Sequence, residues 1–188
     1  YNIELLKYAG DDGIAAYGVM MYVSMIFSAA FIGYSIGTAP VIGFHNGAGN
    51  HRELRGILRK SLIMLCVCGA LMIASAELLA EPLAKIFVSY SAPLMEMTVH
   101  GFRIFAVSFP FMGFAIFNSG FFTALNDGLT SALISFLRTL VFQVFAVLVL
   151  PMVLDIDGIW YALVFAEAAA LLVSAALLVK NRNRYHYV

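Results

Sequence analysis

The feature that most constrains this chain is a long segment without any charged side chain. From Ile14 to Asn50 the sequence contains no Asp, Glu, Lys or Arg. A helix crosses the hydrocarbon layer of a bilayer with about 20 apolar residues, so this segment is long enough for a complete crossing. It is also longer than most helices in the core of a soluble domain. The sequence therefore predicts a membrane protein.

The composition of the chain supports the same class. The 188 residues are 62% hydrophobic and only 12% charged, whereas soluble domains average about 25% charged residues. So few charges do not cover a water-facing surface. The formal net charge is zero, and no basic face indicates binding to a nucleic acid. Membrane lipid is therefore the expected surroundings, and no nucleic-acid partner is expected.

Charged residues fall in clusters, and the apolar runs between the clusters give the expected spans. Residues 1–10 carry an apolar face and are expected to be the end of an earlier helix, closed by Gly10. The segment near 82–90, beginning at Pro82, is too short to cross and is expected to form an amphipathic helix on the outer interface. The fold class is therefore an all-α polytopic membrane helix bundle. Its five complete membrane helices are expected near residues 14–44, 61–80, 99–124, 132–153 and 158–179.

The Lys and Arg residues near the ends of the spans predict the orientation of the chain. Cytoplasmic loops carry an excess of these residues. Basic clusters follow the first and the fifth span, and a count of five crossings puts both on one side. The first cluster consists of Arg52, Arg55, Arg59 and Lys60, and the second of Lys180, Arg182 and Arg184. We therefore expect a multi-pass protein of a bacterial-type plasma membrane, with the loops 45–60 and 125–131 and the tail 180–188 in the cytoplasm.

Several short motifs, taken in order along the whole chain, resemble the carboxy-terminal lobe of multidrug and toxic compound extrusion (MATE) transporters. The motifs are AAYGV at 15–19, GTAPVIGFHNGAGN at 37–50, FFTALND at 121–127, SFLR at 135–138 and DIDGIWYA at 155–162. The resemblance implies two lobes of six helices around a central cavity. Residues 1–188 would then be the carboxy-terminal lobe, with the amino-terminal lobe as a missing partner.

The resemblance also implies a function. Such proteins are secondary active efflux antiporters, which export small amphipathic and often cationic compounds in exchange for sodium or protons by alternating access. The alternative is a lipid-linked oligosaccharide or polysaccharide flippase of the same superfamily. Those proteins usually have cavities richer in Arg and Lys, and Arg103 and Arg138 are the only candidates here.

Enzymatic activity is not expected from the sequence. An intramembrane enzyme using Glu167 and His100 lacks a further partner at a suitable depth, and no Walker motif or nucleophile triad is present. The histidines show no metal-binding spacing. We therefore expect no catalytic residue, no cofactor and no metal site.

One stripe of the first span is a candidate substrate or ion pathway. Tyr17, Ser24 and Ser28 recur on it with soft and aromatic neighbours at helical spacing. Aromatic faces attract cations, and Met side chains adapt to varied shapes. The stripe equally fits an ordinary interface between helices, and both alternatives stay open.

The third span offers a second candidate face. Phe114, Asn118 and Phe121 lie on one side of it. A polar amide at this depth is expected to face another helix or a water-lined cavity. Some members of the family carry a cation-binding acid on this helix, but no Asp or Glu lies between Met97 and Asp127 here. Sodium coordination from this helix is therefore in doubt.

The cytoplasmic half of the first span contains a candidate hinge formed by Gly37, Pro40 and Gly43. Proline removes one backbone hydrogen bond and strains the helix, which a membrane tolerates only beside protein or cavity water. An alternative is that Gly33 and Gly37 allow close packing of another helix.

Arg103, Arg138 and Glu167 lie inside the predicted spans, where charge is costly. Arg103 is near the outer end of its span and is expected to extend its guanidinium to the interface. Arg138 is expected to pair with Asp127 or to bind helix carbonyls. Glu167, near the middle of the last span, is a candidate for proton coupling or a fixed hydrogen-bonded brace. In the family, the usual coupling acids lie in helices outside this sequence.

Overall fold

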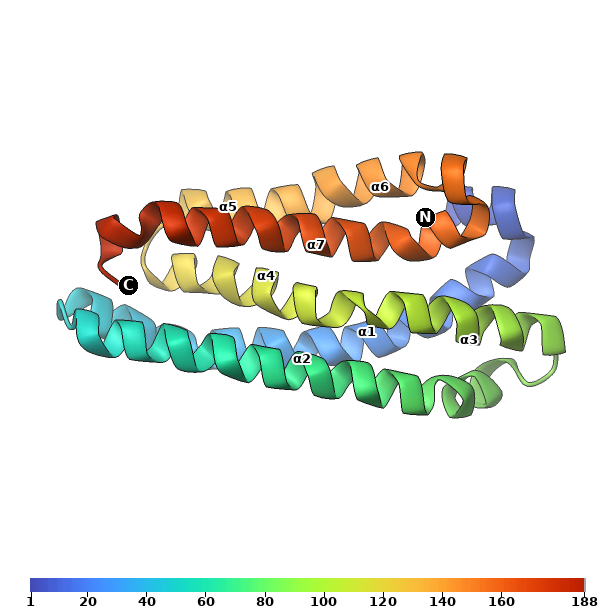
Figure 1. The fold of residues 1–188 in the computed structure, drawn as a ribbon, viewed down its shortest axis with the longest axis horizontal. Helices are drawn as coiled ribbons and strands as arrows, with labels where there is room; N and C mark the ends of the chain where they lie inside the picture. The colour runs from blue at the N-terminus through green and yellow to red at the C-terminus, as the bar shows by residue number, and fades with distance from the viewer. Residues whose placement is uncertain (188) are drawn as a thin grey trace.

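A computed structural model of the chain describes residues 1–187 and contains helices and short connections only within that part. The helices lie roughly side by side as one elongated bundle (Figure 1). The elements are α1 (Asn2–Gly47), α2 (His51–Val88), α3 (Ala92–Ala106), α4 (Ser108–Ala124), α5 (Gly128–Phe136), the π-helical segment η1 (Leu137–Phe142), α6 (Gln143–Val149) and α7 (Pro151–Tyr185).

The lengths and compositions of these helices fit a multi-pass membrane protein. Among residues 1–187, four helical stretches are each long and apolar enough to cross a bilayer, and α3 with α4, bent by 43°, makes up to a fifth. Large apolar side chains also cover the outside of the bundle. Tyr22 and Leu71 are each 62% exposed and Leu172 is 72% exposed. A continuous apolar surface of this kind is stable against acyl chains rather than water.

Gly10 breaks α1 near its start. Its φ of 62° and ψ of −153° are not helical, and this region of backbone angles is accessible essentially to glycine alone. The first turns therefore run in a different direction from the long span that follows. The expectation that Gly10 separates an earlier helix from the first span agrees with this break.

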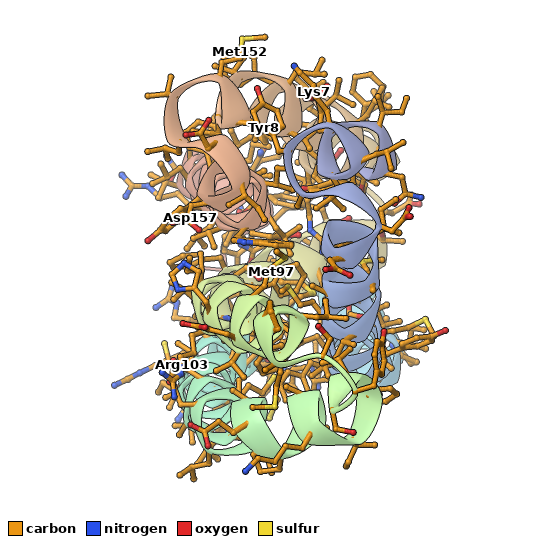
Figure 2. The ribbon with its side chains drawn as sticks, turned by 90° about the vertical axis from the view of Figure 1, so that its right-hand side faces the viewer. Lys7, Tyr8, Met97, Arg103, Met152 and Asp157 are labelled. Carbon is orange, nitrogen blue, oxygen red and sulfur yellow. The ribbon has the colours of Figure 1, made fainter. Side chains whose placement is uncertain are left out.

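The separate amphipathic helix expected from Pro82 is wrong, because α2 continues through Pro82 to Val88. Burial holds these turns in place: Ala84 and Val88 are 0% and 3% exposed and belong to the same apolar core as Leu94 of α3. Proline removes only one helical hydrogen bond, which packing of this kind offsets. Figure 2 shows the last turns of α2 lying across the end of the bundle.

The boundary between the last two spans lies earlier than the sequence indicates. We expected the fourth span to reach residue 153, but α6 ends at Val149 and α7 begins at Pro151. Proline suits the first position of a helix, since its missing N–H would have no partner there. Asp155 then interrupts α7 with a φ of 49°. The long part of α7 therefore starts after Asp155.

Helix α4 lies at the centre of the bundle and packs against α1, α2, α5 and α7. Gly113 makes this possible, because a Cβ atom there would lie 2.6 Å from the ring of Phe31 on α1. Gly33 and Gly37 have no such role among residues 1–187, because no atom beyond the neighbouring backbone of α1 lies within 4 Å of the position of their missing Cβ atoms. The alternative that these two glycines serve helix packing therefore finds no support within residues 1–187.

The segments predicted to be cytoplasmic meet at one end of the bundle (Figure 1). The rings of His51 and His186 are 5.0 Å apart, and Nη1 of Arg184 lies 3.6 Å from Oδ2 of Asp127. Both basic clusters and the loop 125–131 thus share one end, as a chain with an even number of crossings between the clusters requires. Val188, the last residue of the predicted tail, lies outside the described residues.

Candidate functional site

A cavity of about 370 Å³ opens between Tyr1, residues 17–28 of α1, the beginning of α4, the η1–α6 segment and α7. We call it the inner cavity. Its walls combine aromatic rings, thioethers, hydroxyl groups and one pair of opposite charges. They consist of Tyr1, Tyr17, Met21, Ser24, Ser28, Met112, Arg138, Gln143, Leu163 and Glu167.

Arg138 and Glu167 form an ion pair in this wall. The Nε atom of Arg138 donates to both carboxylate oxygens, at 2.7 Å to Oε2 and 3.0 Å to Oε1. The Glu167 side chain is only 1% exposed and the Arg138 side chain 21% exposed. Removing either partner from such a pair would leave a charge without compensation in an apolar interior. The pair therefore connects η1 to α7 at the depth of the predicted spans.

The π-helical segment η1 explains how Arg138 reaches the inner cavity beside Gln143. In a regular α-helix two residues five positions apart point in directions about 140° different, whereas the wider turn of a π-helix brings them closer to one face. Arg138 lies in η1, Gln143 follows directly after it, and both line the inner cavity. A guanidinium and an amide thus share one wall. Helical periodicity in the sequence does not predict this turn.

Two tyrosines form the aromatic side of the inner cavity. The rings of Tyr1 and Tyr17 stack with centroids 4.9 Å apart, and Phe105 meets Tyr17 edge-on at 6.4 Å. The buried hydroxyl of Tyr1 has no hydrogen-bond partner among residues 1–187. Ser28 donates to the carbonyl of Met25 in its own helix at 3.0 Å. The cavity thus offers aromatic faces and hydroxyl groups at close range.

This arrangement determines what the inner cavity can bind. Its only carboxylate, Glu167, is already neutralised by Arg138. A cation that enters must therefore compete with the guanidinium for Glu167, or bind to the aromatic faces and hydroxyls instead. A proton competes in the same way, because a protonated carboxyl no longer holds the guanidinium by charge.

The structure brings together only some of the predicted pathway residues. Tyr17, Ser24, Ser28 and Glu167 all line the inner cavity. Phe114 and Asn118 line a different hollow on the other side of α4. Their separation follows from helix geometry, because Met112 faces the inner cavity and a residue two positions further points about 200° away. The two predicted faces therefore line two separate hollows in the structure.

The side chains of Asn118 and Phe121 both contact α7 or the residues that follow it. The Nδ2 of Asn118 donates to Ser174 Oγ on α7 at 3.0 Å, which is the helix partner expected for a polar group at this depth. Phe121 is 0% exposed and meets the ring of Tyr187 edge-on at 5.2 Å. Phe121 thus belongs to the apolar core at the end of the bundle where Tyr187 lies.

The pairing expected between Arg138 and Asp127 is wrong. Asp127 precedes α5 as its N-cap and accepts hydrogen bonds from Thr130, at 3.2 Å from N–H and 2.8 Å from the hydroxyl. The hydroxyl of Tyr185 also donates to Asp127, at 2.9 Å. Arg138 lies in the next turns of the chain, where its guanidinium meets Glu167 instead. The sequence did contain a signal for the pair of Arg138 and Glu167. The two opposite charges lie in neighbouring spans, and a charge inside the membrane needs a partner.

Arg103 lies at the opposite end of the bundle, at its periphery (Figure 2). Its Nε is 3.4 Å from Glu77 Oε2 and its Nη2 is 3.9 Å from Glu81 Oε1, and all three side chains are about half exposed. His100 makes a similar contact there, with its Nε2 2.9 Å from Asp157 Oδ1. These contacts link α2 to α3 and α3 to α7 at the rim of the bundle.

The candidate hinge does not interrupt α1 in this conformation. Pro40 lies inside the helix, and Gly10 is the residue of α1 with non-helical backbone angles. A Cβ atom on Gly43 would lie 3.4 Å from the carbonyl oxygen of Ala124, so α1 and α4 approach closely there. A hinge at Gly37, Pro40 and Gly43 therefore stays a prediction about motion.

Sequence reasoning missed several lining residues of the inner cavity, namely Tyr1, Met112, Gln143 and Leu163. Tyr1 precedes the break at Gly10, and no periodicity placed it beside Tyr17. Among residues 1–187 no group of three His, Cys, Asp or Glu side chains is placed to hold a metal ion.

Comparisons with known proteins give a family and a fold. A protein-family model described as MatE matches residues 2–148. A crystal structure described as MATE in complex with MaL6 superposes on 100% of this chain with a TM-score of 0.90 and 20% identity, and the match covers 42% of that chain. No curated protein sequence matches this one.

Two further solved structures differ from each other in conformation. Both are described as a multidrug resistance MATE family transporter of the MOP superfamily. The match to the outward-facing structure covers 98% of this chain and 41% of the chain in that structure, with a TM-score of 0.88 and 21% identity. The match to the inward-facing structure covers 97% of this chain and 42% of the chain in that structure, with a TM-score of 0.86 and 20% identity. This chain thus spans about two fifths of the solved structures it resembles.

Proposed function

This chain belongs to the MatE family, and from that membership we propose that it serves as the carboxy-terminal lobe of a secondary active efflux antiporter. The transporter would export small amphipathic, cationic compounds in exchange for sodium or protons. Exchange needs a second lobe, because alternating access works by the rocking of one half against the other around a site between them. The amino-terminal lobe of the same protein is thus the proposed partner.

The observation that carries this proposal is the ion pair of Arg138 and Glu167 in the wall of the inner cavity. A carboxylate inside a membrane is costly and marks ion or substrate pathways. Here it has a guanidinium partner, so it is held in place until a proton or cation competes for it. The other candidates, Tyr17, Ser24 and Ser28, lie around the same cavity and supply rings and hydroxyls.

We propose that competition at Glu167 links ion binding to the position of α7. If Glu167 is neutralised, Arg138 loses its electrostatic partner and η1 is released from α7. A change in helix position that one ligand favours is what alternating access requires. The coupling ion is a proton or sodium in this proposal. The candidate hinge at Gly37, Pro40 and Gly43 would allow α1 to follow.

The flippase alternative finds less support in the lobe. Binding of an anionic lipid-linked sugar requires arginines with free guanidinium groups. Arg103 lies beside Glu77 and Glu81, and Arg138 is bound to Glu167. Both candidate arginines therefore already have carboxylate partners.

For the cellular location we propose a bacterial-type plasma membrane, with the end that contains residues 45–60, 125–131 and 180–187 in the cytoplasm. The basic clusters at that end support this orientation. The opposite end carries acidic residues such as Glu77, Glu81 and Asp157.

Ethidium efflux tests the proposal. Cells that make the full transporter are loaded with ethidium, and loss of fluorescence is followed with and without ionophores. We expect export that stops when the ion gradients are dissipated, and a strong reduction in Glu167→Gln. Export that continues unchanged with ionophores would contradict ion coupling. Transport of a lipid-linked sugar without ethidium export would favour the flippase.

A further inference from the structure

A second hollow lies on the far side of α4 from the inner cavity. It has a volume of about 360 Å³ and is formed by α2, α4 and α7. Its walls are almost entirely apolar and include Leu58 and Leu62 from α2, Phe114 from α4 and Ala175 and Leu178 from α7. We call it the α2–α7 groove. Its volume lies within the range of ordinary ligand sites, about 300–1,000 Å³.

The α2–α7 groove has a cation at one end. Arg182 lines it, is exposed, and has no carboxylate within ion-pair distance among residues 1–187. The neighbouring Arg184 differs, because it lies 3.6 Å from Asp127. Arg182 therefore has its guanidinium available for a ligand.

The position of Arg182 in the bundle places this charge at the membrane surface. The contact of the His51 and His186 rings, 5.0 Å apart, shows that the beginning of α2 and the end of α7 meet there. The exposed Arg52, Arg55 and Arg59 of α2 lie at the same end. An apolar groove that ends at a basic surface matches the two parts of a phospholipid.

We propose that the α2–α7 groove binds one anionic phospholipid, with an acyl chain along its apolar walls and the phosphate of the headgroup at Arg182. Basic pockets between membrane helices on the cytoplasmic side bind anionic headgroups. Guanidinium groups also hold phosphate through charge-assisted hydrogen bonds. The site is separate from the inner cavity, so the bound lipid is a component of the lobe rather than exported cargo.

The bound lipid would connect α2 to α7 at the groove. These two helices are separated there by α4, and an acyl chain between them extends the apolar packing of the bundle. Anionic lipid is therefore expected to stabilise the lobe more than zwitterionic lipid. This stabilisation does not depend on the transported compound or on the coupling ion.

Binding is tested on the full transporter in detergent, with dioleoyl phosphatidylglycerol and dioleoyl phosphatidylcholine as probes. Native mass spectrometry counts bound lipid, and the midpoint of thermal unfolding reports stabilisation. We expect the wild type to retain phosphatidylglycerol in preference to phosphatidylcholine. Arg182→Gln should weaken phosphatidylglycerol binding about fivefold, the effect of one basic residue near an anionic surface. Arg55→Gln, which removes an exposed charge outside the groove, should weaken it less.

The groove itself is tested by a matched pair of variants on α7. Ala175 lines the groove, so Ala175→Phe places a ring in it. The neighbouring Ala176 is exposed and does not line the groove, so Ala176→Phe leaves the groove open. We expect Ala175→Phe to lose the tightly retained phosphatidylglycerol and Ala176→Phe to keep it. Glycerol 3-phosphate, which has no acyl chain, should give no stabilisation.

Three results would overturn the proposal. They are equal retention of the two lipids by the wild type, equal weakening by Arg182→Gln and Arg55→Gln, and stabilisation by glycerol 3-phosphate as large as that by the lipid. If Ala175→Phe does not fold, the comparison of Arg182→Gln with Arg55→Gln still decides. Because lipid retention is measured without transport, a failure of ethidium export leaves this test unaffected.

Discussion

Arg138 and Glu167 come from different helices and meet inside the bundle, with Nε of the arginine 2.7 Å from Oε2 of the glutamate. They connect η1 to α7 beside the tyrosines of the inner cavity. The two residues are 29 positions apart in the sequence, so folding of the lobe is needed to create the pair. This relationship makes the fourth and fifth spans dependent on each other.

The first prediction is that removing either charge destabilises the lobe. Glu167→Gln and Arg138→Met should each lower the free energy of unfolding by about 3–5 kcal/mol, because each leaves one buried charge without its partner. The double variant Arg138→Met with Glu167→Gln should lose much less than the sum of the single changes, since no unpaired charge remains. Unfolding of purified protein in mixed detergent measures all three values.

A double-mutant cycle makes this prediction specific to the pair. Arg103→Met provides a control, because Arg103 is half exposed at the rim and its contacts with Glu77 and Glu81 are longer. Exposed pairs contribute about 0–1 kcal/mol. If the effects of the Arg138 and Glu167 changes simply added, the two side chains would not be coupled in the folded protein.

The second prediction concerns the effect of pH on Asp127, the N-cap of α5. Burial opposes ionisation of this carboxyl, but hydrogen bonds from Thr130 and Tyr185 and the charge of Arg184 outweigh it, so its pKa lies below the ordinary value. The unfolded chain has the ordinary aspartate pKa of about 3.9. The stabilisation is therefore complete above that pH and is lost as pH falls through the lower folded pKa.

Comparison of thermal unfolding between wild type and Asp127→Asn checks this dependence. The wild type should unfold at a higher temperature near pH 6, and the difference should shrink below pH of about 4. Asp12→Asn, which changes an exposed aspartate of α1, should show no comparable difference. A gap between wild type and Asp127→Asn that stayed constant at low pH would mean that the ionised carboxylate is not what stabilises the loop.

The third prediction concerns the break at Gly10. Gly10→Ala should lower the free energy of unfolding by about 1–3 kcal/mol, because alanine is strained at a φ of 62° and a ψ of −153°. Gly18→Ala is the matched control, since Gly18 lies in the continuous part of α1 with no atom within 4 Å of its missing Cβ. In a helix that change is neutral or stabilising by up to about 1 kcal/mol. Equal effects of the two changes would show that the backbone at Gly10 is not constrained.

The membrane spans were predictable because long apolar segments are stable in a bilayer and charged segments are stable in water. A charge-free run such as Ile14 to Asn50 has few alternatives to crossing a bilayer, and the two basic clusters agree with a count of five crossings. The separate helix at Pro82 was wrong because tertiary burial of Ala84 and Val88 carried α2 past the proline. A local signal for a helix start cannot report packing by distant residues.

The candidate site was only partly predictable, for a geometric reason. Helical periodicity placed Tyr17, Ser24 and Ser28 on one stripe of the first span, and in the structure all three line one cavity. It assumed regular α-helices, however, so the π-helical turn that brings Arg138 beside Gln143 was not anticipated. Periodicity also defines the faces of one helix without saying what each face meets. The side of α4 with Phe114 and Asn118 thus turned out to belong to the α2–α7 groove.

The last prediction separates a hinge from a structural role for Pro40. Pro40→Ala restores a backbone N–H inside a helix whose angles are already helical, so the free energy of unfolding should stay equal or rise. If α1 bends here during transport, the same change should slow ethidium export, because the extra hydrogen bond with the preceding turn resists bending. Thermal unfolding and efflux are measured on the same preparations. Unchanged export in a more stable Pro40→Ala protein would show that bending at this proline is not part of the cycle.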